Sequence, residues 1–384
     1  MADDTLTATI AGSVAEIDPG TWNALVAATD PHLNPFVDHA FLLALEQSGS
    51  ATRRTGWTPR HVVLRSEGAI VGVLPMYEKT HSQGEYVFDH GWASAFEQAG
   101  GRYYPKLQCA VPFTPVTAPK LLTIDRNNAT QRALFTAAKV YAGERGIATI
   151  HATFLPEDEA QLAVEEDWLL RTDTQFHWHN AGYTSFDDFL GTMSSRHRKA
   201  TRRERREAAS GLTIKWLAGP DLTEGVWDAF FDFYQDTGNR KWGRPYLNRR
   251  FFSLLSEAMA DRIVLMLAYD GAHPIAGTLS MLGADKLYGR YWGATRHVPF
   301  LHFELCYYQA IDFAIARGLE TVEAGAQGEH KLARGYEPAT TRSVHWIGHR
   351  GLRDAVARFL EQERRSVSRE QAALDTLTPF KKKA

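Results

Sequence analysis

The sequence contains little cysteine and no long apolar run, and both absences narrow the class of protein. Its 384 residues include only Cys109 and Cys306, too few for a disulfide framework or a thiolate zinc site. No stretch approaches about 18 consecutive apolar residues, and the first residues lack the basic and apolar regions of a signal peptide. We therefore expect a soluble protein of a reducing cytoplasm, with membrane contact that is at most peripheral.

The chain also lacks an excess of charge of either sign. Its 43 Lys and Arg residues face 45 Asp and Glu residues, a formal net charge of -2, so the whole chain has no preference for DNA or for a membrane. Hydrophobic residues make up 44% of the sequence, enough to build a sizeable core. At about 150 residues per domain, this length predicts two or three domains, or one long α/β unit.

An internal repeat links the two halves of the chain. Residues 62–76 predict a strand, a Glu-Gly turn and a return strand that contains a glycine. Residues 265–281 repeat this pattern, with His273 and Pro274 expected as a two-residue extension of the turn. Such self-similarity predicts two copies of one structural unit in tandem.

Each half continues with a helix that ends at a glycine and leads into a strand. The helix ends are Arg145-Gly146 and Arg317-Gly318. The first half carries about 33 extra residues, which we place in the irregular stretch 80–120 and interpret as a functional loop. Hairpins followed by helices and strands predict a mixed α/β fold. The predicted divisions are an N-terminal domain, a C-terminal domain that holds the catalytic site, and a charged helical tail: 1–174, 175–349 and 350–384.

A strongly basic segment lies between the halves. Residues 196–206 hold seven Lys and Arg against one Glu, in a helix expected to begin near Thr184. A solvated helix face and a site for a phosphate-bearing ligand both explain this charge. We interpret the tail as a solvated appendage, and contact of the tail with a membrane or nucleic acid stays a lesser alternative.

Five segments of the sequence resemble one known group of proteins. They are Leu287–Ala294, Leu301–Ala316, Glu323–Lys331, Tyr103–Gln108 and Val111–Val116. The group is the bacterial FemAB-like predicted N-acyltransferases, a branch of the GNAT superfamily. The resemblance implies two tandem GNAT-like domains that transfer an acyl group to an amine. It names neither the acyl donor nor the amine; we expect acyl-CoA as co-substrate and no bound cofactor.

The sequence departs from better-known relatives at two places. Residues 294–301 stand where GNAT enzymes commonly have an Arg or Gln followed by a Gly-rich pyrophosphate loop. The basic helix has no partner long enough to form the antiparallel helical arm that is common in tRNA-dependent Fem ligases. The donor class, acyl-CoA or aminoacyl-tRNA, is therefore left open by the sequence.

Titratable residues are dense in the Gly-rich turn 325–331, which directly follows a predicted strand. Glu329 and His330 are adjacent there, and either can act as the base that deprotonates an amine. The alternative is a polar turn whose glycines serve backbone geometry alone. The phosphate-binding candidates combine this turn with the basic helix: Gly325, Gln327, Gly328, Lys331, Arg198, Lys199, Arg202 and Arg203.

The start of the helix near residue 301 offers His302 and Glu304. At 100° per residue the two side chains point about 200° apart, so at most one can face a cleft. We favour His302 as catalytic and assign Glu304 to substrate binding, since the helix dipole alone explains a carboxylate in a first turn. His302 is expected to share a face with Cys306 and Gln309. Cys306 is a conceivable nucleophile, but we interpret it as a small core residue.

Two further groups complete the candidates. Arg290 and Tyr291 are expected on opposite faces of a strand, and Tyr291 is assigned to oxyanion support. Pairs of histidines elsewhere lack the spacing of a zinc site, so no metal is expected. The extra stretch of the first half supplies acceptor-binding candidates between the domains: Asp89, His90, Trp92, Lys106 and Gln108.

The leading hypothesis is a cytoplasmic N-acyltransferase that joins an acyl group, from an acyl-CoA, to a small-molecule or lipid amine. One alternative is ceramide-synthase-like acylation of a long-chain sphingoid amine. A second is a Fem-type transferase that uses aminoacyl-tRNA in cell-wall synthesis. A third, from another class, is a non-catalytic tandem scaffold.

Overall fold

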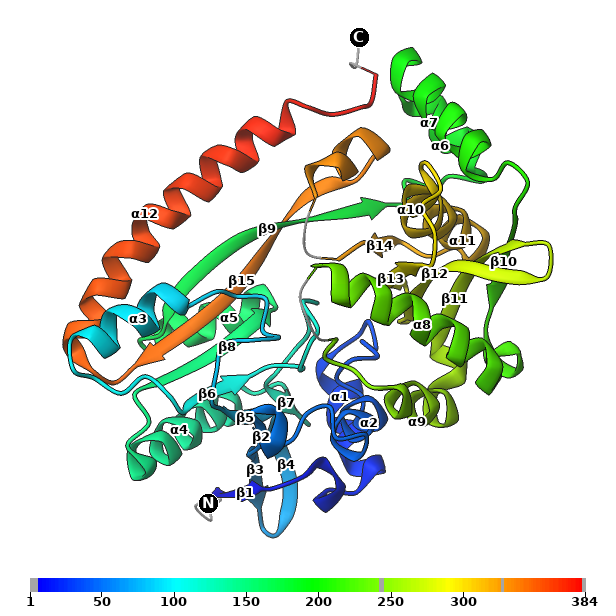
Figure 1. The fold of residues 1–384 in the computed structure, drawn as a ribbon. Coiled ribbons are helices and arrows are strands. Elements are labelled where there is room, and N and C mark those ends of the chain that lie inside the picture. The colour runs from blue at the N-terminus through cyan, green and yellow to red at the C-terminus, as the bar shows by residue number, and fades with distance from the viewer. Residues whose placement is uncertain (1–5, 242–244, 326–327, 382–384) are drawn as a thin grey trace. The chain divides into compact units, whose positions relative to one another are not determined.

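The computed structural model describes residues 6–241, 245–325 and 328–381 (Figure 1). It divides into two compact units. Unit 1 comprises the chain up to Asp173 together with Thr340–Ser368, and unit 2 comprises Thr174–Ala339 and the residues from Arg369 onward. The first division falls within one residue of the predicted one, whereas the C-terminal division differs from it.

The strands of unit 1 form two groups. One is an antiparallel sheet of order β1-β3-β4-β7, whose strands are Thr7–Ala11, His61–Ser66, Ala69–Leu74 and Leu122–Thr123. The other has the order β15-β8-β6-β5-β2, with strands Glu337–Ile347, Thr149–Leu155, Lys106–Cys109, Met76–Lys79 and Trp57–Pro59. Within this group β6 and β8 are parallel.

The helices of unit 1 begin and end where the sequence supplies capping residues. Asp18 caps α1 by accepting a hydrogen bond from the Thr21 N–H, and Gly146 ends α4 with a left-handed backbone (φ 63°). The α helices are α1 (Pro19–Thr29), α2 (His39–Gln47), α3 (His90–Gln98), α4 (Asn128–Arg145), α5 (Glu157–Glu165) and the first part of α12 (Arg350–Asp375). Helix α3 and strand β6 both lie in the stretch 80–120 that the sequence predicts as a loop.

The C-terminal tail is not the solvated appendage that the sequence predicts. Strand β15 pairs with β8, which ties residues after Thr340 to unit 1. Helix α12 then buries Leu352, Val356 and Leu360 in a cluster with Trp92 and Tyr103. Leucine and valine at intervals of four residues make one face of α12 apolar, and that face packs into unit 1.

Unit 2 is built on a largely antiparallel sheet of order β10-β11-β12-β13-β14-β9. Its strands are Thr213–Leu217, Ile263–Asp270, His273–Leu282, Lys286–Ala294, Thr321–Glu323 and the part of β9 (Leu169–His179) from Thr174 onward. Among its described strands β13 and β14 are parallel, and a helical connection joins them. Such a crossover is what a parallel pair requires.

The helices of unit 2 are α6 (Phe186–Thr192), α7 (Ser195–Ala208), α8 (Glu224–Lys241), α9 (Arg249–Met259), α10 (Leu301–Phe303) and α11 (Gln309–Arg317). A π-helical turn, Glu304–Tyr308, joins α10 to α11, and a 3₁₀ helix spans Glu329–Arg334. The predicted helix end at Gly318 is confirmed, with φ 65°. The basic segment forms α7, separated from α6 by Met193 and Ser194.

The two predicted hairpins are confirmed as β3–β4 and β11–β12. His273 and Pro274 do not extend the turn: they pair with Asp270 and Tyr269 in the ladder. The strands of the second hairpin have 8 and 10 residues, whereas those of the first have 6 each. The insertion therefore lengthens the ladder and leaves the turn short. A two-residue turn matches the twist of the flanking strands, which a longer loop does not.

Candidate functional site

The parallel pairing of β13 and β14 ends early, and the chain opens there. Among the described residues, pairing stops at Tyr288 with Glu323, although β13 continues to Ala294 beside β12. A β-bulge at Arg290 interrupts the β12–β13 ladder one residue after Gly289. Bulges bend a strand and re-aim its side chains. The edge of β13 beyond Gly289 is therefore turned away from β14.

Two aromatic side chains and His302 gather next to this opening. The ring of His302 lies 5.2 Å from that of Trp292 on β13 and 5.4 Å from that of Tyr307. The π-helical turn aligns residues five apart, which is why His302 faces Tyr307. It also brings Gln309 to Glu304, since the Gln309 Nε2 donates to Glu304 Oε1 at 2.7 Å. The predicted face shared by His302 and Gln309 does not form.

His330 completes the group from the other side of the opening. Its Nε2 lies 2.8 Å from the Tyr307 hydroxyl, and its ring centroid is 6.4 Å from that of His302. Burial raises the pKa of Tyr307 above its ordinary value, so the phenol stays protonated at neutral pH. The structure thus brings together His302 and His330, two of the residues that the sequence predicts as catalytic.

Gly328 makes room for the His330 imidazole. Its backbone has φ 120°, and a Cβ built there would lie 2.3 Å from His330 Cε1. Real Cβ atoms do not approach other atoms so closely. The glycine that the sequence predicts as phosphate-binding therefore positions the histidine in this structure.

A cavity of about 530 Å³ lies beside His302, within the usual range of ligand pockets, about 300–1,000 Å³. Its apolar walls come from the end of β13, the loop after it and α10: Trp292, Ala294, Val298, Pro299, Phe300, Leu301 and Phe303. The polar lining is Arg296, His297 and His302. An alkyl or aromatic group fits these walls better than a phosphate does.

The Lys331 side chain is buried and forms a hydrogen bond to Gly325, the second residue after β14. Its Nζ donates to the carbonyl oxygen of Gly325 at 2.8 Å, and burial lowers the pKa of Lys331 to about 7. Lys331 and Gly325, both predicted as phosphate-binding, are bonded to each other here. Gln327 and the side chain of Glu329 lie outside the described residues, so their predicted roles stay predictions.

Glu304 is buried and forms an ion pair with Arg205. Arg205 of α7 donates to it from Nη2 at 3.0 Å, and the same nitrogen lies 2.6 Å from Asp312. Burial alone would lower the pKa of Arg205, but the carboxylates of Glu304 and Asp312 outweigh it and raise that pKa. Instead of the predicted contact with substrate, Glu304 fixes α7 against the π-helical turn.

Four other basic residues of α7 are predicted to bind phosphate. Arg202 is paired with Asp187 at 2.9 Å and Arg203 with Glu207 at 3.7 Å, all largely exposed. Arg198 donates weakly to the Met193 carbonyl at 3.4 Å, and Lys199 is exposed. No ion pair to a carboxylate is found for Lys199 within the described residues.

Tyr291 lies on the other side of β13 from the cavity. Its ring packs 5.2 Å from that of Tyr234 on α8, and the guanidinium of Arg290 lies 5.3 Å from it. The two side chains do not take opposite faces as predicted, because the bulge at Arg290 breaks the alternation of the strand. Burial raises the pKa of Tyr291. Trp292 takes the place facing the cavity.

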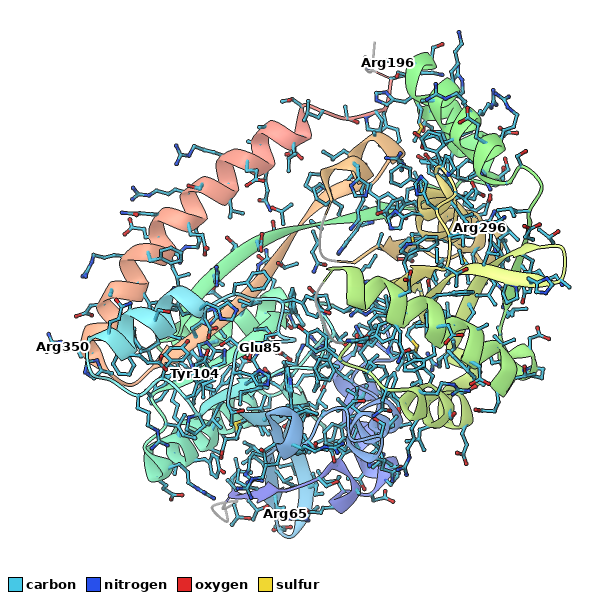
Figure 2. All side chains as sticks on the ribbon, in the orientation of Figure 1. Arg65, Glu85, Tyr104, Arg196, Arg296 and Arg350 are labelled. Atoms are coloured by element: carbon cyan, nitrogen blue, oxygen red, sulfur yellow. The ribbon has the colours of Figure 1, made fainter. Side chains whose placement is uncertain are left out.

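The candidates of unit 1 form a buried ionic network. Lys106 Nζ lies 2.6 Å from Glu85 and 2.5 Å from Asp89, and it donates to Ser82 at 2.7 Å. The Tyr103 hydroxyl donates to Asp89 at 2.6 Å. Burial would raise the pKa of Asp89, but the ammonium of Lys106 outweighs it and lowers that pKa. Figure 2 labels Glu85 at this network.

The remaining candidates of unit 1 are also engaged within it. Gln108 is buried and donates to Thr153 at 3.1 Å. Trp92 packs edge-on against His345, at 4.9 Å between ring centroids. Exposed His90 stacks near Phe88. Asp89 and Lys106 pair with each other, because a buried charge needs a partner, and Gln108 and Trp92 contact other residues of unit 1.

The comparisons with known proteins agree with this architecture. Residues 13–382 match the model of the FemAB-like family, whose description is peptidoglycan biosynthesis or recognition. The chain belongs to the FemAB-like family. No curated protein matches the sequence significantly. Membership of this family supports the broad prediction of a transferase.

Solved structures resemble this chain in fold. FemX has a TM-score of 0.53 at 13% identity, over 89% of this chain and 98% of FemX. A conserved protein of unknown function from Bacteroides thetaiotaomicron has a TM-score of 0.52 at 10% identity, over 88% and 99%. A tandem GNAT protein from the clavulanic acid pathway has a TM-score of 0.49 at 12% identity, over 90% and 99%. The predicted mixed α/β fold is confirmed.

Several residues of the candidate site could not be predicted from the sequence. Tyr307 faces His302 through the π-helical turn, which the sequence does not predict. Arg334 lies 3.5 Å over the Phe303 ring and pairs with Glu204 at 2.8 Å. No group of three or more metal-ligating side chains gathers in the described part of the chain. None of the described helices is both long and apolar enough to span a bilayer.

Proposed function

We propose that this FemAB-like protein is an N-acyltransferase that forms an amide between an activated acyl group and an amine, with the chemistry in unit 2. The observation that carries the proposal is the His330–Tyr307 pair at the opening between β13 and β14. The freed edge of β13 offers backbone hydrogen-bonding groups to an extended donor. The apolar cavity beside His302 favours substrates that carry an alkyl chain.

The pair has the groups that acyl transfer needs. The neutral amine attacks the acyl carbonyl carbon, the C–N bond forms, and the bond to the thiol or hydroxyl leaving group breaks. The His330 imidazole takes the proton that the amine loses. The Tyr307 phenol, kept protonated by burial, donates to the carbonyl oxygen or to the leaving atom.

The test uses the full chain with isotope-labelled palmitoyl-CoA, acetyl-CoA and aminoacyl-tRNA, each offered to a set of amines that includes sphinganine. Mass spectrometry then detects labelled amide. We expect amide from the long-chain donor, with His330→Gln lowering the rate by about 100-fold or more and Tyr307→Phe lowering it less. The matched control is His273→Gln, because His273 is exposed in the β11–β12 hairpin.

Fem-type aminoacyl transfer is the second candidate, favoured by the family description and by the fold of FemX. If aminoacyl-tRNA were the only one of the three donors to give labelled product, aminoacyl transfer would replace the acyl-CoA reaction as the function. Full turnover by His330→Gln would refute the assigned base. No product with any donor, from a protein that still captures a partner, would favour the non-catalytic scaffold.

A further inference from the structure

The outward face of α7 carries a stripe of positive charge. Four basic residues recur at intervals of three and four, so they share one side of the helix. The opposite side buries Thr201 and Ala208 and directs Arg205 to Glu304. These inward contacts fix which face of α7 is turned to solvent. The exposed residues of the stripe are Arg196, Lys199, Arg203 and Arg206.

Carboxylates neutralise this stripe only in part. Glu207 lies on the same face and pairs with Arg203, while Asp187 pairs with Arg202 at the edge. Within the described residues, no carboxylate forms an ion pair with the other three bases of the stripe: Arg196, Lys199 and Arg206. Their charge is therefore available to an external anion.

The end of the chain adds to the same surface. The Ser194 N–H donates to the Pro379 carbonyl at 2.9 Å, and the Lys381 N–H donates to the Thr192 carbonyl at 3.0 Å. These bonds hold exposed Lys381 at the start of α7. Figure 1 draws the end of the chain beside this helix, and Figure 2 labels Arg196 there. Leu377, just before, is 59% exposed.

We propose that this α7 surface, made of Arg196, Lys199, Arg206, Lys381 and Leu377, docks on an anionic phospholipid membrane. Basic side chains near such a surface are drawn to its negative potential. An exposed leucine beside them can enter the headgroup region. A single-stranded RNA site combines basic residues with aromatic rings on which bases stack, and α7 contains no Phe, Tyr or Trp. A basic helix without aromatic residues therefore favours a lipid surface over single-stranded RNA.

The test measures sedimentation of the full chain with vesicles of phosphatidylcholine, with and without phosphatidylglycerol, at low and high salt. We expect binding only to the anionic vesicles, weakened by salt. The triple variant Arg196→Gln, Lys199→Gln, Arg206→Gln should bind about 100-fold less, at roughly fivefold per charge. Leu377→Ser should bind more weakly than the unaltered chain.

A control variant removes three exposed charges from other helices: Arg145→Gln, Arg250→Gln and Arg350→Gln. It should lose less than about threefold, because those side chains are not part of the α7 surface. Equal losses in both triple variants would overturn the proposal, as would equal binding to neutral vesicles. Binding to a tRNA preparation but not to vesicles would assign the surface to nucleic acid instead. Vesicle binding needs no substrate, so its outcome is independent of the acyl-transfer test.

Discussion

Gly328→Ala is the substitution that probes the candidate site with the least change in chemistry. It adds one methyl group and removes no functional group. At φ 120° the added Cβ would lie 2.3 Å from His330 Cε1 and 2.8 Å from His330 Nδ1. The imidazole must therefore move, and its contact with the Tyr307 hydroxyl, now 2.8 Å, is lost.

The expected magnitudes separate folding from chemistry. A non-glycine residue at a positive φ costs about 1–3 kcal/mol of stability, which leaves most of a domain's stability of about 5–15 kcal/mol. Displacement of the base should lower the acyl-transfer rate by about 100-fold or more. A folded but nearly inactive variant is therefore expected.

Gly318→Ala is the matched control. Gly318 also has a left-handed backbone, with φ 65°, but nothing lies within 4 Å of a Cβ built there. Denaturant unfolding should show similar losses of stability for the two variants, whereas the amide-forming rate should fall only for Gly328→Ala. If the two variants kept rates within about twofold of each other, the positioning of His330 by Gly328 would be refuted.

Three further predictions concern the framework around the site and the network of unit 1. Lys106→Met leaves Asp89 buried without its lysine and Glu85 with Lys79 alone, so chemical denaturation should show a loss of about 3–5 kcal/mol, part of which Asp89→Asn restores in the double variant; no loss would mean that the network is not ionised. Gly293→Ala places a Cβ 2.0 Å from the backbone oxygen of Phe233, and a loss of about 2–3 kcal/mol in the same assay is expected because α8 must shift; unchanged stability would contradict this packing. Burial lowers the pKa of Lys331 from 10.5 to about 7, so between these values the unfolded chain binds more protons and stability rises with pH. Compared with Lys331→Met, the unaltered chain should gain up to about 1.4 kcal/mol per pH unit between pH 7 and 9, and parallel stability curves would show that the amine is not buried.

Local patterns account for what the sequence predicts well. The hairpins and the glycine helix ends follow from alternation and from the left-handed backbone that glycine permits. His302 and His330 are candidates because titratable residues lie there at the ends of predicted elements. The sequence does not show that these two side chains are close together in the fold. The internal repeat predicts the tandem arrangement, and the family resemblance adds that each unit is GNAT-like.

Long-range partners account for what the sequence does not predict. Arg205 and Glu304 are 99 residues apart, so nothing local marks Glu304 as an ion-pair residue. The π-helical turn shifts the facing of side chains, and no spacing rule for a regular helix anticipates it. The pattern of apolar residues in α12 was visible, but its partners in unit 1 were not, and the tail was misread as solvated.

Photo-crosslinking tests the central claim, that unit 2 binds the acyl donor beside His302 and His330, most directly. The probe is a long-chain acyl-CoA with a diazirine on its alkyl chain, and peptide mass spectrometry locates the adducts. We expect adducts in residues 292–303 that unlabelled palmitoyl-CoA prevents. Adducts confined to unit 1, or labelling that palmitoyl-CoA leaves unchanged, would contradict it.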